Sequence, residues 1–373
     1  MKVAIDALGI SQPGGGRSAT LNLLQPLLQQ DAEDAFILFV DALEPSLQGH
    51  ANLRQVVVPT KHRLAVRAWA QATWPAFLRR ERVDVIHFTK NLVTLLNPCR
   101  SVVTIHDLTI LVHPEIYPRL DVLYWRTLER YSLRHIDRII SVSDVTARDL
   151  MRFYGIAPGR IEVIYEGIDD IFRPMPPEEV ARVRAKYHLP RSYLLHVGSI
   201  SPKKNLATLA RAYGHLVRGG FYDGALVLVG RAYWEGGDRT LDDYLAGEAR
   251  GGRVIRTGAV PQEDLPALYS GAECFVFPSL HEGFGLVPLE SLACGVPVIA
   301  SRVGVLEQLI GGAALFLDDP RDDRALADAI AELLGDERLR QRLIEEGLRL
   351  APTFSRHRAA KRTLALYRQL AGA

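Results

Sequence analysis

The stretch FVFPSLHEGFGLVPLESLACGVPVIAS, residues 275–301, decides the fold class. It begins within the apolar run Cys274–Phe277, which is typical of a buried strand and ends at a proline. A glycine-rich turn then opens a helical segment containing Leu289–Cys294, and after a glycine the run Val296–Ala300 is strand-like again. Strand, loop, helix and strand in this order predict one unit of a parallel sheet.

Runs of the same kind alternate with amphipathic segments along the whole chain. Apolar strands between helices imply parallel sheets covered on both faces. Clustered prolines in 173–190 indicate a linker, so we expect two Rossmann-like α/β domains, 1–172 and 191–355. The expected strands of the first are Val3–Ala7, Ala35–Val40, Gln55–Val58, Val83–Phe88, Val102–Ile105, Arg138–Val142 and Glu162–Tyr165, and those of the second are Tyr193–Val197, Ala225–Val229, Val254–Thr257, Cys274–Phe277, Pro297–Ala300 and Ala314–Leu317.

Composition narrows the class of protein. With 373 residues, of which 48% are hydrophobic, the chain can build two cores and does not resemble a disordered chain. A net charge of +2 gives no general reason to expect a nucleic-acid partner. The start MKVAIDALGI is typical of a strand rather than a signal peptide, and no apolar run reaches the roughly 18 residues of a spanning helix. We therefore expect a cytoplasmic protein.

Two acidic residues, Glu282 and Glu290, flank the glycine-rich turn that holds Gly283 and Gly285. Free N–H groups at such a turn can bind phosphate or sugar oxygens. Glu282 would lie at the mouth of the turn, and Glu290 about a turn and a half inside the helix, on a side that can face the same ligand. One carboxylate could accept hydrogen bonds from sugar hydroxyls and the other from a ribose diol. A surface glutamate beside a capping loop is the alternative.

The quoted stretch resembles the donor-binding signature of the retaining GT-B glycosyltransferases of the group 1 type (family 4-like), whose hallmark is two glutamates separated by seven residues. The preceding GAVPQEDLPALYSGAECFVFPS, residues 258–279, is similar to the stretch that packs around the nucleotide base in that family. The resemblance implies two domains facing each other across a cleft, with a C-terminal helix, 356–373, crossing back onto the first. It places at the donor Val260, Gly283, Phe284, Gly285 and Leu286.

A basic pair, Lys203 and Lys204, lies in the segment VGSISPKKNL, residues 197–206, between a strand and a helix. Two ammonium groups there suit a diphosphate leaving group, which gains negative charge as the glycosidic bond breaks. A solvated pair is the alternative, although a helix start disfavours lysine. By the resemblance, the second lysine contacts phosphate. Many members of the family carry an arginine where this chain has Ser199, which leaves less side-chain charge for the diphosphate.

The glycine loop that holds Gly15 and Gly16 follows the first strand and precedes the helical segment Ala19–Gln30. It lacks the G-x-G-x-x-G spacing of a dinucleotide-binding loop, which disfavours an NAD-dependent dehydrogenase. A tight loop of this kind lets a donor phosphate or an acceptor approach the backbone, and it fits the resemblance. We expect Gly15 and Gly16 to contact the donor.

His106 lies in TIHDL, residues 104–108, at the carboxyl end of a strand, where open α/β sheets bind ligands. A lone histidine is usually structural. The resembling family has a histidine at this place that approaches the transferred sugar. We therefore expect His106 to polarise or hydrogen-bond the sugar, and not to act as a nucleophile.

The acceptor side is less defined. Lys90 and Asn91 follow a strand and are candidate acceptor contacts. Residues 54–138 contain fourteen Lys and Arg against seven Asp and Glu, and KHRLAVRAWAQATWPAFLRR, residues 61–80, interleaves aromatic and basic residues. Such a segment can lie on an anionic membrane, which would make the protein peripheral at the inner face, or it can be an ordinary helix that buries its aromatic residues.

The chain has no D-x-D motif, no clustered metal ligands and no G-x-S-x-G elbow. We therefore expect no metal and no cofactor other than a GDP- or UDP-linked sugar as co-substrate. The expected catalytic residues are His106, Glu282 and Lys204. By the resemblance, closest to bacterial mannosyltransferases of polysaccharide assembly, a hexosyl group passes with retention to a glycan or glycolipid hydroxyl, with GDP-mannose as the first donor. The alternatives are a nucleotide-sugar 2-epimerase and a non-catalytic sugar-nucleotide-binding protein.

Overall fold

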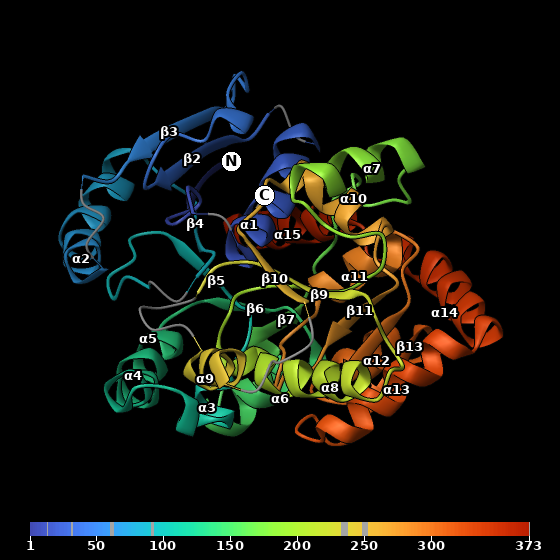
Figure 1. Ribbon diagram of the computed structural model, residues 1–373. Coiled ribbons are helices and arrows are strands. Elements are labelled where there is room, and N and C mark those ends of the chain that lie inside the picture. The colour runs from blue at the N-terminus through green and yellow to red at the C-terminus, as the bar shows by residue number, and fades with distance from the viewer. Residues whose placement is uncertain are drawn as a thin grey trace. The chain divides into compact units, whose positions relative to one another are not determined.

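The computed structural model describes residues 1–12, 14–30, 33–59, 63–90, 93–232, 238–247 and 253–372. The chain forms two compact units (Figure 1). Unit 1 comprises Met1–Gly167 and Ser355–Ala373, and unit 2 comprises Ile168–Phe354. Each unit is built on one parallel sheet packed with helices, so the prediction of two Rossmann-like α/β domains is confirmed.

The sheet of unit 1 has the strand order β3-β2-β1-β4-β5-β6-β7, and all its pairs are parallel. The strand order reverses between β1 and β4, and open α/β sheets bind ligands beyond the carboxyl ends of the strands at such a switch point. The strands are β1 (Lys2–Asp6), β2 (Ala35–Val40), β3 (Leu53–Val57), β4 (Val85–Phe88), β5 (Arg100–Ile105), β6 (Arg138–Ser141) and β7 (Ile161–Val163).

Side chains alternate along these strands, so each face of the sheet has a core of its own. Val3 and Ile5 pack with α1 and α15 on one face, whereas Ala4 packs with α2 on the other. Figure 1 shows α15 beside α1. The helices of unit 1 are α1 (Gly15–Gln30), α2 (Arg63–Arg80), α3 (Thr109–Val112), α4 (Arg119–Tyr124), α5 (Arg130–Arg134), α6 (Asp144–Asp149) and α15 (Arg356–Ala371), with π-helical turns at η3 (Trp125–Glu129) and η4 (Leu150–Tyr154).

The aromatic residues of the basic stretch 61–80 pack inward. Its residues 61 and 62 lie outside the described ranges, and the rest forms α2. Trp74 is fully buried and stacks on Phe39 with 4.3 Å between ring centroids. Trp69 and Phe77 are partly buried against the same core. The described part of this stretch is thus an ordinary helix that buries its aromatic side chains.

The sheet of unit 2 has the strand order β10-β9-β8-β11-β12-β13, again with parallel pairs. Its switch point lies between β8 and β11, so the segments that follow these two strands share one edge of the sheet. The strands are β8 (Tyr193–Val197), β9 (Ala225–Val229), β10 (Arg253–Gly258), β11 (Cys274–Phe277), β12 (Val298–Ser301) and β13 (Ala314–Leu317).

The boundary between the units differs from the one expected at 172. Unit 2 begins at Ile168, and the stretch 173–190 belongs to it. Although this stretch is rich in proline, it contains a helix, α7, because Pro176 and Pro177 lie at the start of the helix, where a missing N–H costs nothing. The helices of unit 2 are α7 (Pro177–Lys186), α8 (Leu206–Arg218), α9 (Arg239–Gly247), α10 (Leu265–Ser270), α11 (Leu286–Ala293), α12 (Leu306–Ile310), α13 (Asp323–Gly335) and α14 (Glu337–Leu350).

Candidate functional site

Two lysines and a glutamate meet at the switch point of unit 2. After β8 the chain forms the short 3-10 helix η6 (Pro202–Lys204), and after β11 it reaches Glu282. Lys204 Nζ donates to Glu282 Oε1 over 2.5 Å, and Lys203 Nζ lies 3.5 Å from Glu282 Oε2. The main-chain N–H of Leu280 donates to the carbonyl of Lys203 over 2.9 Å and ties the two segments together. The structure thus brings three expected site residues into contact.

This cluster carries one more positive than negative charge. Burial alone would raise the pKa of Glu282, but Lys203 and Lys204 hold it below its ordinary value, so the carboxyl is ionised. Lys204 Nζ also lies 4.4 Å from the centre of the Phe277 ring, a cation–π contact that fixes the ammonium group further. A diphosphate would find two ammonium groups already held in place, with the carboxylate of Glu282 as the group that it has to replace.

The glycine-rich turn sets the direction in which α11 begins. Gly285 has φ +124°, and a Cβ at this position would lie 2.5 Å from Leu306 Cδ2, so only glycine fits here. Gly283 and Phe284 are buried, and the ring of Phe284 packs edge-on against Phe354. Leu286 is the first residue of α11. That these residues contact a donor stays a prediction.

Glu290 lies in α11 and is almost fully buried. Its Oε2 accepts a hydrogen bond from the Tyr269 hydroxyl over 3.0 Å. Burial raises the pKa of Glu290 to about 8, and the charge of Asp169 acts in the same direction, whereas Tyr269 opposes it. Without a ligand, Glu290 is therefore mostly protonated at neutral pH. Tyr269, which the sequence did not single out, is its partner.

Three further residues lie near these segments. Ser199 follows β8, and its Oγ lies 3.5 Å from Ser201 Oγ, whereas Val260 is half-buried after β10. His196, in β8, was not predicted. Its Nδ1 donates to the Val276 carbonyl over 3.0 Å, and burial lowers its pKa to about 4, so the ring is neutral. Its Nε2 has no hydrogen-bond partner among the described residues and faces Gly198, at the start of the lysine-bearing loop.

In unit 1, Gly15 and Gly16 form the first residues of α1, and Lys90 packs close to Gly16. The position of a Cβ on Gly16 would lie 3.4 Å from Lys90 Cε. Lys90 Nζ donates to the carbonyl of Leu8 over 2.8 Å, in the loop that follows β1. Lys90 thus supports the glycine loop from within unit 1, and an acceptor contact by Lys90 stays a prediction. Asn91 lies outside the described residues.

Two carboxyl groups whose charges act on Lys90 lie at the ends of the first two strands, Asp6 as the last residue of β1 and Asp41 directly after β2. Burial raises the pKa of Asp6 to about 7, although the Leu8 N–H and Lys90 act against this. Asp41 accepts from the Gly9 N–H over 3.0 Å and from Ser11. Burial alone would raise the pKa of Asp41, but these hydrogen bonds hold it below its ordinary value. The loop after β1 is therefore fixed by a charged carboxylate on one side and by Lys90 on the other.

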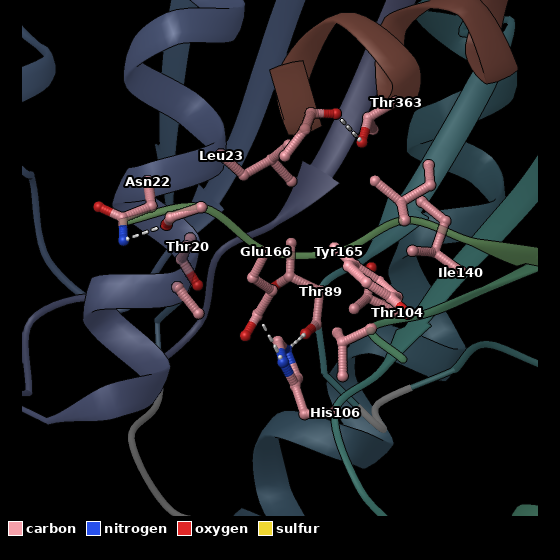
Figure 2. Close-up of a pocket in the computed structure, with 15 residues that line it drawn as sticks. Thr20, Asn22, Leu23, Thr89, Thr104, His106, Ile140, Tyr165, Glu166 and Thr363 are labelled. Carbon is pink, nitrogen blue, oxygen red and sulfur yellow. Dashed lines mark hydrogen bonds and ion pairs between the residues drawn. The ribbon is translucent and has the colours of Figure 1, made fainter. Parts of the chain in front are cut away.

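His106 follows β5 and lines a pocket at the carboxyl edge of the unit 1 sheet (Figure 2). Its Nδ1 lies 3.0 Å from Glu166 Oε1, and its Nε2 lies 3.0 Å from the carbonyl oxygen of Thr89. About a third of the His106 side chain is exposed. The pocket is otherwise lined by residues of β4 to β7 and their loops and of α1 and α15, among them Thr20, Leu23, Thr104 and Thr363.

Comparison with known proteins identifies the family of this chain. The family model described as "Glycosyltransferase Family 4" matches residues 13–171, and the family model described as "Glycosyl transferases group 1" matches residues 181–349. The O-antigen chain mannosyltransferase B of Escherichia coli is 33% identical over 296 residues, which are 79% of this chain and 77% of that protein. This chain belongs to the group 1 glycosyltransferases.

One further related sequence and one solved structure are also similar to this chain. The serotype-specific mannosyltransferase WbdA of Escherichia coli is 30% identical to this glycosyltransferase over 264 residues, 69% of this chain but only 32% of WbdA. The chain therefore spans about a third of that relative. The sucrose-phosphate synthase of Thermosynechococcus elongatus has the same fold, with a TM-score of 0.82 over 99% of both chains at 24% identity.

Besides Tyr269 and His196, the glycosyltransferase holds a third candidate residue that its sequence did not reveal, Glu166. Glu166 follows β7 in the segment IYEGID, and it contacts His106 across the pocket. The only signal in the sequence is its place directly after a strand of a parallel sheet, a position that many structural residues share. The contact depends on two strands brought close by the fold, so the sequence alone could not reveal it.

Within the part of the chain that the structure describes, no group of three or more His, Cys, Asp or Glu side chains could hold a metal ion. That this glycosyltransferase works without a metal stays a prediction. None of the helices in the described ranges is long and apolar enough to cross a membrane.

Proposed function

We propose that this glycosyltransferase moves a hexosyl group from a nucleoside diphosphate sugar to a hydroxyl of a glycan or glycolipid, with retention of the anomeric configuration. GDP-mannose is the first donor to test, because two similar proteins of Escherichia coli are named mannosyltransferases. UDP-linked sugars come second. The observation that carries the proposal is the cluster of Lys203, Lys204 and Glu282 at the switch point of unit 2.

The cluster fits the charge changes of such a transfer. The bond between the sugar C1 and the diphosphate oxygen breaks, and C1 forms a bond to the acceptor oxygen on the same face. The acceptor proton passes to the departing phosphate oxygen. Lys203 and Lys204 would stabilise the charge that develops on the diphosphate, while Glu282 would exchange a lysine contact for sugar hydroxyls. Glu290 would accept hydrogen bonds from the ribose. No residue has to act as a covalent nucleophile.

A screen of nucleotide release tests the proposal. Purified protein is incubated with GDP- and UDP-sugars, with and without lipid-linked and free glycan acceptors, and the anomeric configuration of any product is read by NMR. We expect acceptor-dependent release from one donor and a product of the donor's own configuration. Conversion of the nucleotide sugar into its 2-epimer would instead support an epimerase, and binding without turnover would support a non-catalytic protein.

Removal of metal ions gives a second test. Because the ammonium groups of Lys203 and Lys204 would neutralise the diphosphate in place of a metal ion, we expect turnover to survive EDTA with less than about a twofold change. The measurement is the initial rate with chelator and after addition of Mg²⁺ or Mn²⁺. Loss of activity with EDTA that either ion restores would contradict the metal-free reaction.

We also propose that the protein contacts an anionic membrane through the outer face of residues 119–134. Leu120 is 80% exposed, and Leu123, Leu128 and Tyr131 are each more than half exposed. The π-helical turn η3 lengthens the helical step between Leu123 and Leu128 and keeps both on the outer side. Exposed arginines on the same stretch suit lipid phosphates and would repel a second copy of this surface. They are Arg119, Arg126, Arg130 and Arg134.

Sedimentation with lipid vesicles tests this contact. We expect binding to vesicles that contain phosphatidylglycerol, weaker binding to phosphatidylcholine vesicles, and a loss of at least about fivefold in Leu120→Ser/Leu123→Ser. Phe221→Ser is the matched control, because Phe221 is 75% exposed but lies in unit 2. Equal binding by the double variant and the control would contradict the assignment of this surface.

A further inference from the structure

The ring of His106 is held by protein oxygens on both sides. Its Nδ1 and Nε2 each lie 3.0 Å from an oxygen, the first of Glu166 and the second of the Thr89 main chain (Figure 2). Neither a carbonyl nor an ionised carboxylate has a hydrogen to donate. A neutral imidazole carries one N–H and could satisfy only one of these acceptors, so the two contacts together describe a protonated ring paired with a carboxylate.

We propose that Glu166 is a positioning residue of the transfer reaction, which keeps His106 charged and fixes the direction of its ring in the pocket. His106 would then act as a cation that polarises substrate oxygens, and Glu166 would act through it. The catalytic part of this proposal rests on the proposed glycosyl transfer, whereas the charge on the ring can be tested without any reaction.

The carboxylate of Glu166 has the geometry to hold this charge. Burial acts to lower the pKa of His106, but Glu166, the Thr89 carbonyl and Asp107 outweigh it, and the pKa lies above its ordinary value. Of these three, Glu166 has the largest effect. The other histidine nearby, His87 on β4, is buried and neutral, because burial lowers its pKa to about 3.

The neighbours of Glu166 on both sides are anchored to other elements. The hydroxyl of Tyr165 donates to Asp144 on α6 over 2.5 Å, and the carbonyl of Gly167 accepts from Asn22 Nδ2 on α1 over 3.0 Å. A side chain whose main chain is fixed at both ends loses little freedom when it pairs with His106. A second acid of α6, Asp149, has a pKa raised by burial and also by the charge of Asp107.

The contacts of His106 tie together the ends of β4, β5 and β7. Thr89 follows β4, His106 follows β5, and Glu166 follows β7. The hydroxyl of Thr89 in turn donates to the carbonyl of Asp6 at the end of β1 over 2.6 Å. Through Thr89, the ring of His106 is therefore connected to the end of β1, at the edge of the sheet that carries the glycine loop and Lys90. We expect unit 1 to bind substrate at this edge.

A histidine that acts as a cation makes activity depend on pH in one direction. Because the pKa of His106 is raised, the charge is present below that pKa and is lost as pH rises through it. Activity is then lost at the alkaline end, and Glu166 extends the active range toward higher pH. If Glu166 served only the stability of the fold, its substitution would not change the pH at which activity is lost on the alkaline side.

Glu166→Gln separates charge from geometry, since the amide oxygen can still accept from Nδ1–H while the negative charge is gone. In labelled full-length protein, an NMR titration of the His106 ring, assigned with His106→Gln, should show its pKa fall by about one unit or more. Glu162→Gln is the matched control, because Glu162 lies on the same segment but pairs with Arg362. It should leave the pKa of His106 unchanged.

The kinetic arm uses the pH profile of kcat/KM. In Glu166→Gln the alkaline limb should move to lower pH, with activity within about threefold of wild type below pH 6 and roughly tenfold lower at pH 8, as expected for a shift of one unit. Glu166→Asp, which keeps the charge, should restore much of the alkaline activity. An unchanged pKa of His106 in Glu166→Gln overturns the proposal, and so does a lowered pKa with an unmoved kinetic limb. If no sugar is transferred by wild type, the NMR arm still decides the charge on His106, and the failure belongs to the proposed function.

Discussion

Because the carboxyl of Glu290 is protonated without a ligand, we expect donor binding to depend on pH. A ribose diol donates two hydrogen bonds to an ionised carboxylate, but a pKa of about 8 leaves only about a tenth of the Glu290 side chains ionised at pH 7. We therefore expect the affinity for the nucleotide sugar to rise by up to about tenfold between pH 7 and pH 9. Calorimetry with the intact nucleotide sugar measures this, since its diphosphate does not itself titrate in this range.

Two variants of Glu290 complete the experiment. Glu290→Gln should bind with an affinity that does not change between pH 7 and pH 9, and Glu290→Ala should lose about 1–3 kcal/mol of binding free energy because the ribose hydroxyls lose their partner. Wild-type affinity that is flat with pH, or equal affinity in Glu290→Ala, would remove Glu290 from the donor site.

Single residues show how far a sequence can indicate a site. Lys203, Lys204 and Glu282 could be proposed because their spacing from two strands matches a known family, and the structure brings them into contact. Glu166 and Tyr269 could not, because each becomes relevant only through a partner far away in the chain, His106 for one and Glu290 for the other. Residue types at strand ends are visible in a sequence, but the pairs that they form depend on the fold.

For secondary structure elements, the clearest test concerns α2, whose aromatic residues could have faced either a membrane or the core. Trp74 lies between Phe39 and Phe88, with ring centroids 4.3 Å and 6.2 Å away. We expect Trp74→Ala to lower the free energy of unfolding by about 3–5 kcal/mol, as measured by denaturant titration. Trp69→Ala, in which a partly buried ring is removed, should cost less. A Trp74→Ala variant that is as stable as wild type but binds vesicles less well would instead indicate that the aromatic residues of α2 face a membrane.

The strands were predicted well because their signal is local. Every strand of the described residues overlaps an expected one, and β2, β8, β9, β11 and β13 have the expected bounds. Apolar runs of this length are determined by burial on both faces of a parallel sheet. The helix α7 was missed because its prolines lie in a cluster that is also typical of a linker, and only the packing of Val183 in unit 2 distinguishes the two.

At the scale of the whole molecule, the chain passes twice between the units, at Gly167 and at Phe354. The two crossings lie side by side. The N–H of Ile168 donates to the carbonyl of Phe354 over 3.0 Å, and the main chain of Gly167 lies against that of Arg356. After the second crossing, α15 returns to unit 1, where Tyr367 is fully buried and contacts His87. The last helix of the sequence thus completes the core of the first unit.

This close approach makes Gly167 a position that no other residue can fill without a shift of backbone. A Cβ here would lie 2.1 Å from the main-chain N of Arg356, and backbone atoms cannot rotate away as a side chain could. We expect Gly167→Ala to destabilise unit 1 by about 1–3 kcal/mol, the usual cost of overpacking. That corresponds to a Tm lower by roughly 2–4 °C for each kcal/mol in a unit of this size, measured by calorimetry. Gly159→Ala is the control, because a Cβ at Gly159 meets nothing within 4 Å, and its Tm should not fall. Equal Tm values for the two variants would mean that the crossings can separate freely, and the contact between Gly167 and Arg356 would then not hold α15 in unit 1.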